Sequence, residues 1–247
     1  MSKPTQPDYG IDAPNVLRNL LGSGAALLLL GFFGPRAVRL GPVVFLLHPA
    51  FFSAGASLFL AGVLMLLYVK VGKYRHREYV LGFHPWHGDE RVLDVGTGRG
   101  LLLAGAARRL KSGHATGLDI WSREDMAGNS AESTQRNLQL EGVAPRCTLI
   151  SDSAVAMPFL DSSFDVVLSN LCLHNIYDRA QRRQACAEIA RVLAPGGIAI
   201  ISDYKLTAEY ARTFLNLGLI VERRKSNWLA TFPPLGVVTA RKNQGLA

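Results

Sequence analysis

Residues 91–100 read Arg-Val-Leu-Asp-Val-Gly-Thr-Gly-Arg-Gly, and this stretch indicates an α/β fold. Its first half, residues 91–95, is a short apolar run that predicts a buried strand. Glycines then occur at alternate positions, and residues 101–110 predict a helix that is apolar nearly all round. Glycines in such a turn let the backbone approach a ligand closely and place amide donors at a helix N-terminus. The stretch therefore predicts a strand, a ligand-binding turn and a helix.

The same alternation of strands and helices continues toward the C-terminus. Further strands are expected at 115–120, 146–151, 165–169 and 198–202, and helices at 130–141, 178–193 and 207–217. The Pro-Gly-Gly run at 195–197 is expected to separate the second of these helices from the strand after it. Residues 219–224 and 235–241 have no helix between them and predict an antiparallel hairpin. The expected fold is α/β, with five βα units capped by the hairpin in a mixed, mostly parallel sheet covered by helices on both faces.

The glycine turn also indicates the kind of ligand. Gly96, Gly98 and Gly100 have the spacing G-x-G-x-G, and Asp94 precedes the first glycine by two residues. Nicotinamide-dependent oxidoreductases use G-x-G-x-x-G instead, and an acid at this place would repel a pyrophosphate. Asp94 suits the positively charged amino group of S-adenosylmethionine, so that cofactor is expected here.

Loops after the next two strands complete an adenosine site. Asp119, followed by Ile120, lies at the end of the second strand, where a carboxylate can accept hydrogen bonds from both ribose hydroxyls. Asp152 follows the third strand, where it can accept from the adenine amino group, and Ser153 can contribute a backbone donor. Proteins that bind nicotinamide dinucleotides and proteins that bind S-adenosylmethionine both place an acidic residue at the ribose. Asp119 therefore supports adenosine binding but does not distinguish between these two cofactors.

The end of the fourth strand should face the reacting methyl group. Asn170 ends this strand and is either structural or in contact with the edge of the cofactor. His174 follows, and a histidine of near-neutral pKa could remove a proton from the methyl acceptor. The alternative is that His174 and Asn175 cap a helix or hydrogen-bond within the loop. Both interpretations remain open from the sequence.

Four segments together resemble the class I S-adenosylmethionine-dependent methyltransferases, in particular the small-molecule group that includes the ubiquinone/menaquinone biosynthesis methyltransferases. They are VLDVGTGRG (92–100), GLDI (117–120), SDSAVAMPFLDSSFDVVLSNLCLHNI (151–176) and EIARVLAPGGIAIISDY (188–204), and the resemblance covers roughly residues 85–241. It implies a Rossmann-like, seven-stranded sheet with a reversed last strand and S-adenosylmethionine as methyl donor. By position it places Asp94, Gly96, Gly98 and Gly100 at the methionine part, Asp119 at the ribose, Asp152 at the adenine and Asn170 at the cofactor's edge.

The sequence departs from this family in two places. Arg99 stands where the family often has a small or hydroxyl residue, and the loop 121–129 is longer than usual and is expected to form part of the acceptor pocket. The family supplies no transferable base, so the role of His174 rests on its position alone. The three cysteines have no metal-ligand spacing, and no metal site is expected.

The first 70 residues have a different composition. Between residues 20 and 69 only Arg36 and Arg39 carry a charge, and residues 51–69 are nineteen uncharged, largely apolar residues. About 20 such residues cross a bilayer, so 51–69 predicts a transmembrane helix. Residues 17–33 allow three interpretations: a first spanning helix, a half-inserted helix or the apolar core of a signal peptide. A hairpin with residues 34–50 as its outer connection is favoured, because a signal peptide would place the cofactor site outside the cell.

The charge distribution predicts that the catalytic domain lies on the cytoplasmic side, the alternative being that the charge belongs to a solvated basic surface. The formal net charge is +8, and four cations cluster directly after the apolar run, at Lys70, Lys73, Arg75 and Arg77. Such a cluster follows the positive-inside rule and attracts anionic lipid. Tyr74 is the one Phe, Tyr or Trp residue among these four cations, so a nucleic-acid partner is not expected. A membrane segment at 1–72 and a methyltransferase domain at 73–247 are predicted.

The expected function is a membrane-tethered methyltransferase acting on a small acceptor that is lipophilic or adjacent to the membrane. Three alternative functions compete with it: a protein or nucleic-acid methyltransferase, a nicotinamide oxidoreductase and a cofactor-binding module without catalysis. Methyltransferases that modify amino groups of proteins or nucleic acids commonly carry proline and an aromatic residue after the Asn170 position, where this chain has Leu-Cys-Leu at 171–173. The glycine spacing and Asp94 disfavour the oxidoreductase. The intact glycines and the three matched acids argue against the non-catalytic module without excluding it.

Overall fold

Seven strands build the central sheet of the computed structural model, which describes residues 6–11, 13–122, 128–225 and 231–244. They are β3 (Arg91–Val95), β4 (His114–Asp119), β5 (Cys147–Ser151), β6 (Phe164–Asn170), β7 (Leu193–Asp203), β8 (Ile220–Lys225) and β9 (Gly236–Arg241). Their order across the sheet is β5-β4-β3-β6-β7-β9-β8, and β9 runs antiparallel to both its neighbours. This confirms the predicted mostly parallel, seven-stranded sheet with a reversed last strand.

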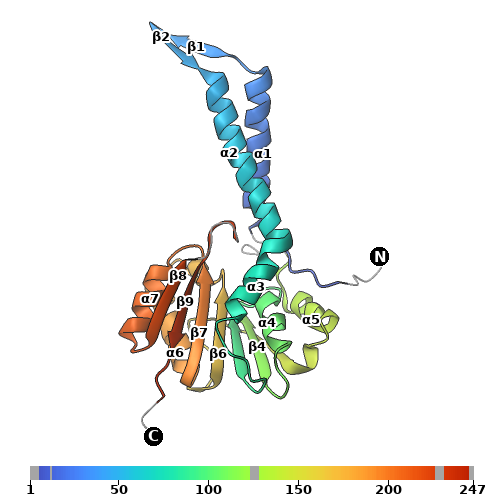
Figure 1. The fold of residues 1–247 in the computed structure, drawn as a ribbon, viewed down its shortest axis with the longest axis vertical. Helices are drawn as coiled ribbons and strands as arrows, with labels where there is room; N and C mark the ends of the chain where they lie inside the picture. Colours follow the sequence, from blue (N-terminus) through green and yellow to red (C-terminus); the bar gives the residue numbers. More distant parts are fainter. Residues whose placement is uncertain (1–5, 12, 123–127, 226–230, 245–247) are drawn as a thin grey trace.

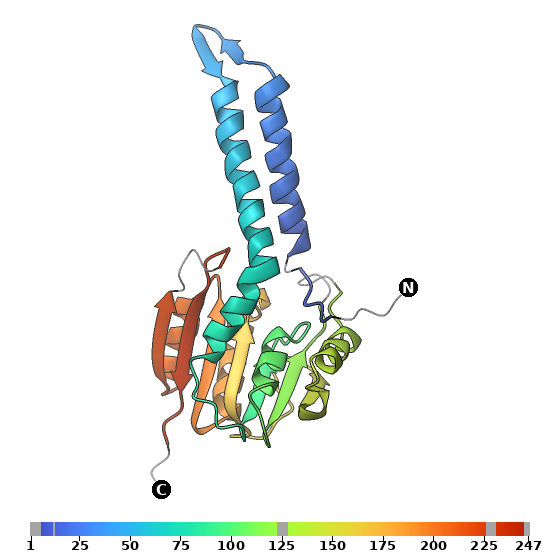
Figure 2. The same ribbon diagram turned by 45° about the vertical axis from the view of Figure 1, so that its right-hand side comes forward.

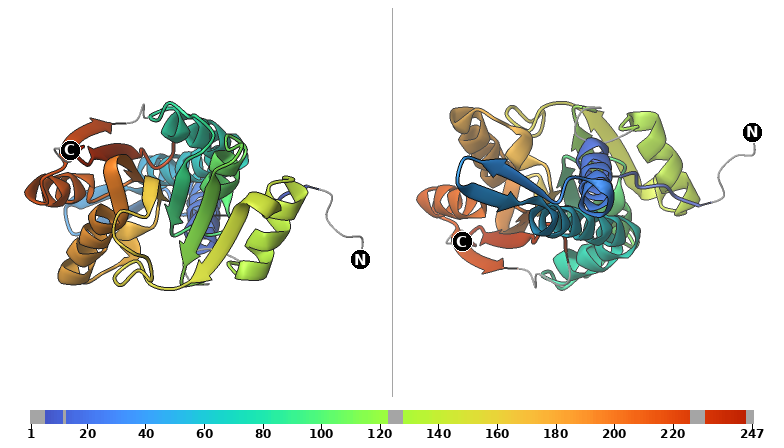
Figure 3. Two further views of the ribbon diagram at one scale, coloured as in Figure 1. Left: turned by 90° about the horizontal axis from the view of Figure 1, so that it is seen from below. Right: turned by 90° about the horizontal axis from the view of Figure 1, so that it is seen from above.

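Helices cover both faces of the sheet (Figure 1; Figure 3). One face packs against α3 (Lys73–Leu81), α4 (Leu101–Ala107) and α5 (Ala131–Leu140), and the other against α6 (Arg179–Val192) and α7 (Thr207–Asn216). Successive strand residues point to opposite faces of the sheet. Val92 therefore packs on the face covered by α3, α4 and α5, and Leu93 on the face covered by α6 and α7. Both residues are fully buried. Short 3₁₀ turns lie at Ala144–Arg146 and Leu173–Asn175.

Two sequence predictions are wrong in detail. The described residues between β5 and β6 form turns and contain no helix, so four of the five expected βα units are complete. β7 begins at Leu193, directly after α6, and the Pro-Gly-Gly run lies inside this strand. Gly196 has a φ of +79°, and a Cβ at Gly197 would lie 2.8 Å from the carbonyl oxygen of Asp165 on β6. The glycines there permit a close approach of two strands and do not end an element.

An antiparallel helical hairpin stands on the sheet domain (Figure 1; Figure 2). It consists of α1 (Pro14–Phe33), the short strands β1 (Ala37–Leu40) and β2 (Val43–Leu46), and α2 (Leu47–Leu67). Helix α2 continues through a π-helical turn (Tyr68–Gly72) into α3, so the expected boundary at residue 72 falls inside one continuous helix. By length and composition, α1 and the continuous helix 47–81 are each long and apolar enough to cross a membrane.

Glycines set the distance between the two hairpin helices. A Cβ at Gly24 of α1 would lie 2.6 Å from the backbone nitrogen of Phe59, and one at Gly55 of α2 would lie 2.8 Å from that of Leu28. No real Cβ approaches backbone so closely, so these positions require glycine. Small residues at such crossings are typical of helices that pack inside a membrane, where close backbone approach supplies the contact.

Candidate active site

The turn after β3 has the backbone that its glycines predict. Gly96, Gly98 and Gly100 have φ values of +71°, +52° and +83°, a region that residues with a Cβ rarely adopt. Gly96 is constrained a second time, because a Cβ there would lie 2.2 Å from the sulfur of Cys172. Glycine is therefore required at position 96, where the backbone runs close to Cys172 of the loop after β6.

Asp94 lies beneath this turn and is almost completely buried. One carboxylate oxygen, Oδ2, accepts hydrogen bonds from the hydroxyl of Thr97 at 2.9 Å and from the backbone N–H of Leu103 at 3.0 Å. Burial, together with the negative charge of Asp119, raises the pKa of Asp94 to about 7, although the hydrogen bonds from Thr97 and Leu103 oppose this rise. A cation beside this carboxylate would favour its charged form, so the site is suited to a positively charged ligand group.

Asp119 organises the same region from the end of β4. Its Oδ2 accepts from the backbone N–H of Gly98 at 2.7 Å, and its Oδ1 accepts from Trp121 N–H at 2.6 Å. The Oδ1 atom also accepts from the amide of Asn129 at 3.3 Å. The carboxylate therefore ties the glycine turn to the loop after β4.

The predicted adenine residues lie further out. Asp152 is exposed, and its Oδ1 accepts the backbone N–H of Ser153 at 2.7 Å, so the expected donor of Ser153 is occupied by its neighbour. The side chain of Ile120 is also exposed. Residues 123–127 of the long loop, which was expected to contribute to the acceptor pocket, lie outside the described residues.

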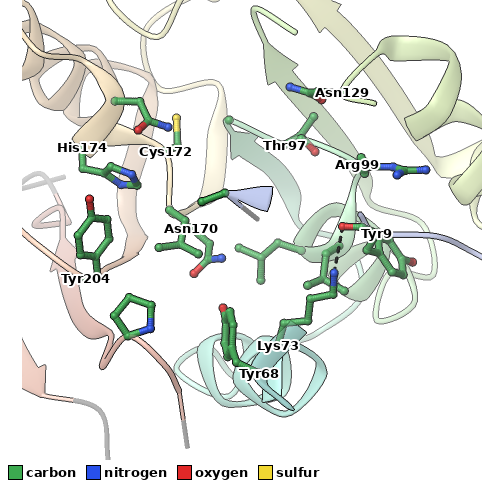
Figure 4. Close-up of a pocket in the computed structure, with 18 of the residues that line it drawn as sticks. Tyr9, Tyr68, Lys73, Thr97, Arg99, Asn129, Asn170, Cys172, His174 and Tyr204 are labelled. Atoms are coloured by element: carbon green, nitrogen blue, oxygen red, sulfur yellow. Dashed lines mark hydrogen bonds between the residues drawn. The ribbon is translucent and has the colours of Figure 1, made fainter. Parts of the chain in front are cut away.

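A cavity of about 480 Å³ lies at the carboxyl ends of β3, β6 and β7 (Figure 4). Most of its polar lining residues lie on the domain side, and the opposite side is mainly apolar. The domain side includes Asp94, Gly96, Thr97, Gly98, Arg99, Asn129, Asn170, Cys172, His174, Asn175 and Tyr204, together with the apolar Leu101, Leu102 and Leu171. The opposite side includes Ala13, Val16 and Leu20 at the base of α1, Met65 and Tyr68 at the base of α2, and Phe232 and Pro233 before β9. The helical hairpin thus forms one wall of the cavity.

Two buried amide oxygens in the lining mark where a ligand would bind. Asn129 Oδ1 and Asn170 Oδ1 are buried and have no hydrogen-bond partner among the described residues. A buried acceptor without a partner costs free energy, on the order of 1–3 kcal/mol. A ligand that carries ammonium or hydroxyl donors would satisfy both atoms. These acceptors and the glycine turn fit the amino and hydroxyl groups of S-adenosylmethionine.

His174 points into the cavity from the 3₁₀ turn after β6 (Figure 4). Its Nδ1 lies 2.8 Å from Oδ1 of Asp203, which is the last residue of β7 and is completely buried. The ring of Tyr204 meets the imidazole edge-to-face, with 4.7 Å between the centroids. His174 is thus held between a carboxylate and an aromatic ring. Among the described residues, no cluster of His, Cys, Asp and Glu could hold a metal ion.

Comparison with known proteins identifies the domain. Residues 93–201 match the family described as methyltransferase domain. The chain is 32% identical over 115 residues to the ubiquinone/menaquinone biosynthesis C-methyltransferase UbiE of Geotalea daltonii, covering 46% of this chain and 45% of that protein. It is 33% identical over 161 residues to the demethylmenaquinone methyltransferase of Symbiobacterium thermophilum, covering 65% and 57%. The chain contains a class I S-adenosylmethionine-dependent methyltransferase domain.

Solved structures agree on the fold. A SAM-dependent methyltransferase from Aquifex aeolicus matches with a TM-score of 0.54 and 18% identity, over 67% of this chain and 88% of that chain. At this identity the likeness shows the fold alone. The chain spans about half the length of the curated relatives it matches.

Not all predicted residues of the methyltransferase domain come together at the cavity. Asp94, Gly96, Gly98, Asn170 and His174 line it. Gly100, Asp119, Ile120, Asp152 and Ser153 do not, although Asp119 reaches the site through Gly98 and Asn129. Asn129 lies in the loop 121–129 that was expected to contribute to the pocket, and it does line the cavity. Sequence reasoning missed Asp203 and Tyr204. A signal for Asp203 was present, because it directly follows the predicted strand 198–202 at the ligand-binding edge.

A short N-terminal strap, residues 8–10, crosses the methyltransferase domain beside the cavity. The buried Lys73 Nζ donates to the carbonyl oxygens of Tyr9 and Gly10 at 3.0 and 2.6 Å. Arg99 forms an ion pair with Asp8 at 3.0 Å. The unusual arginine in the glycine turn therefore holds the strap.

Proposed function

We propose that this protein is a membrane-anchored S-adenosylmethionine-dependent methyltransferase that acts on a small lipophilic acceptor entering from the bilayer. One observation carries the proposal: a single cavity has polar residues of the methyltransferase domain on one side and apolar residues of the helical hairpin on the other. A cavity of about 480 Å³ lies within the range of small-molecule sites. An acceptor could place its reactive group on the polar side while its apolar part contacts α1 and α2.

The polar side is assigned to the cofactor. Asp94 would face the ammonium group, with Gly96, Gly98 and Gly100 cradling the methionine part. Asp119 and Ile120 would bind the ribose and Asn170 the cofactor's edge. Asp152 would bind the adenine, with the backbone N–H of Ser153 holding its carboxylate in place. When bound, S-adenosylmethionine supplies a methyl group already activated on a sulfonium. The chain's task is then to align the acceptor with that methyl group and to exclude water.

The membrane anchor is assigned to residues 1–72 and the methyltransferase domain to 73–247. A helix of 20 residues, such as α1, is about 30 Å long, which matches the hydrocarbon core of a bilayer. Large apolar side chains on the outside of the hairpin are exposed, including Leu29, Phe32, Phe59 and Leu60. Lipid would cover these side chains. The cationic cluster that follows α2 would then place the domain on the cytoplasmic side.

His174 is the proposed general base. It lines the cavity on the domain side, next to Asn170, where the acceptor would meet the methyl group. An acceptor atom that carries a proton becomes a better nucleophile as that proton passes to the imidazole, an effect worth about 10²–10⁴ in rate.

The test is methyl transfer from labelled S-adenosylmethionine in a membrane lipid extract, with the full chain in nanodiscs. We expect the label in the solvent-extractable lipid fraction. The Leu20→Gln variant should raise KM for the lipid acceptor at least 10-fold and leave cofactor affinity within about 3-fold, because Leu20 lines the acceptor side. The matched control Leu29→Gln makes the same change on an exposed part of the same helix and should leave KM unaltered.

Two outcomes would contradict the proposal. Label found only in protein, nucleic acid or water-soluble products would exclude a lipophilic acceptor. Equal effects of the two glutamine variants would show that the hairpin wall does not contact the acceptor.

A further inference from the structure

The carboxylate of Asp203, at the end of β7, accepts three hydrogen bonds. Oδ1 accepts the backbone N–H of Tyr204 at 2.8 Å, while Oδ2 accepts the hydroxyl of Tyr210 at 3.0 Å and the backbone N–H of His174 at 3.3 Å. Tyr210, on α7, is itself completely buried. These three donors fix the plane of the carboxylate and satisfy both of its oxygens.

The imidazole of His174 is an additional partner of this carboxylate. Its Nδ1 lies 2.8 Å from Oδ1 of Asp203, an ion-pair distance, but the N–H direction is not aligned for a hydrogen bond. Hydrogen bonds between catalytic groups are often poorly aligned in unliganded enzymes and improve when substrate binds. The ring of Tyr204 packs on the imidazole from another side. The imidazole therefore has a restricted orientation toward the cavity.

We infer that Asp203 is a positioning residue that holds His174 in the orientation and tautomer of a general base. A proton on Nδ1 that faces the carboxylate leaves Nε2 without a proton, and only an unprotonated nitrogen can accept one from a substrate. The nearby negative charge also stabilises the imidazolium that forms. Similar carboxylate–histidine pairs orient the base in unrelated enzymes. This inference rests on the proposed function, since it assigns the acceptor site to the same cavity.

The pair also narrows the class of acceptor. As the acceptor oxygen or acidic carbon forms its bond to the methyl carbon, its proton passes to Nε2 of His174. The bond between the methyl carbon and sulfur breaks, and its electron pair stays on sulfur, which becomes a neutral thioether. The imidazolium then carries the positive charge that the sulfonium has lost. Such a base is needed by an acceptor with an acidic O–H or C–H group, such as a ring hydroxyl or a carbon between electron-withdrawing groups, and is of no use to a thioether.

Several other titratable groups surround His174 and must be considered in any pH profile. Asp203 and Tyr204 lie on and just after β7, and Tyr210 approaches Asp203 from α7. Lys205 Nζ lies 5.2 Å from the ring of Tyr204. Cys172 lies on the same loop as His174, and burial raises the pKa of its thiol, so it remains protonated. Asp203 is the group at ion-pair distance from the imidazole.

The first experiment measures the tautomer of His174 without any acceptor. Nitrogen-15 NMR of histidine-labelled full chain in detergent, with His174→Gln to assign the signal, should show the Nδ1–H tautomer in the wild type. Asp203→Asn should shift the tautomer toward Nε2–H, because the carboxylate that attracts the Nδ1 proton is lost. The control Asp89→Asn changes an exposed aspartate and should leave the tautomer unaltered.

The second experiment measures turnover with the lipid extract. Asp203→Asn should lower kcat about 10- to 1,000-fold, with cofactor affinity unchanged within 3-fold. In a His174→Ala background the same substitution should cost less than 3-fold.

An equal loss of kcat in both backgrounds, or an unchanged NMR tautomer of His174 in Asp203→Asn, would overturn the inference. Absence of turnover by the wild type with every lipid fraction, together with the expected NMR result, would instead refute the proposed acceptor and leave the histidine–carboxylate pair standing.

Discussion

Asp94 should make the unliganded protein less stable than it could be. Its carboxylate is buried beneath the glycine turn, and both hydrogen bonds that we observe go to a single oxygen, Oδ2. Asp94→Asn keeps the shape of the side chain and removes the charge. We therefore expect the variant to be more stable than the wild type at pH 8 while binding S-adenosylmethionine more weakly.

The size and sign of the effect follow from the pKa. Burial raises the pKa of Asp94 from 3.8 to about 7. Below pH 4 this carboxyl group is protonated in both the folded and the unfolded protein, so it costs nothing. Between pH 4 and 7 the unfolded chain releases the proton and the folded protein retains it, so the stability of the wild type falls as pH rises. Above pH 7 the full cost is reached, which is about 4 kcal/mol at 1.36 per pKa unit.

Thermal unfolding of the full chain in detergent, followed by tryptophan fluorescence, measures this difference. A domain of this size gains about 2–4 °C in Tm for each kcal/mol, so Asp94→Asn should melt roughly 8–16 °C higher at pH 8. At pH 4.5 the cost is only about 1 kcal/mol, so the difference in Tm should shrink to about 2–4 °C. Saturating S-adenosylmethionine should reverse the order at pH 8, because the bound cation compensates the wild-type charge. The exposed Asp89→Asn control should show none of these differences. A variant that melts below the wild type at pH 8 would contradict this prediction. So would a variant whose Tm differs from that of the wild type by the same amount at both pH values.

Three further results are expected. Gly96→Ala should abolish measurable S-adenosylmethionine binding in calorimetry, because its Cβ would meet Cys172. The control Gly142→Ala, also at positive φ but in open space, should retain binding, and equal binding by both variants would contradict the glycine assignment. Asp119→Ala should weaken cofactor binding by about 1–3 kcal/mol and also lower Tm, since the Gly98 and Trp121 amides lose their acceptor; unchanged affinity in a folded variant would remove Asp119 from the site. The full chain should resist carbonate extraction and require detergent, and its recovery in the aqueous wash would show that the hairpin helices do not enter the bilayer.

Local sequence predicted most of the fold because each element carries its own signal. β3 and the glycine turn were readable from the apolar run at 91–95 and the spacing of three glycines, and the structure gives those glycines the positive φ values that only this residue type readily adopts. The error at 195–197 shows the limit of such reading. A Pro-Gly-Gly segment can end a helix or can allow two strands to approach closely, and its composition is the same in both cases. Only the position of β6 shows which role it has here.

The candidate site was less predictable because its parts are distant in the chain. Asp203 follows His174 by 29 residues, and nothing in either segment indicates that β7 lies beside β6 in the register that brings them to 2.8 Å. The acceptor wall is more distant still, since Val16 and Leu20 come from a segment whose composition indicates only membrane insertion. An anchor needs apolar residues anywhere along its length, whereas a substrate pocket needs them at the base of the hairpin, facing His174. Because the continuous helix from α2 into α3 fixes the hairpin on the domain through Lys73 and the buried contact between His76 and Ser202, the same residues can serve both purposes. Under the proposed function the hairpin is both the anchor and one wall of the active site, and substitutions at its base should alter acceptor selection before they alter membrane attachment.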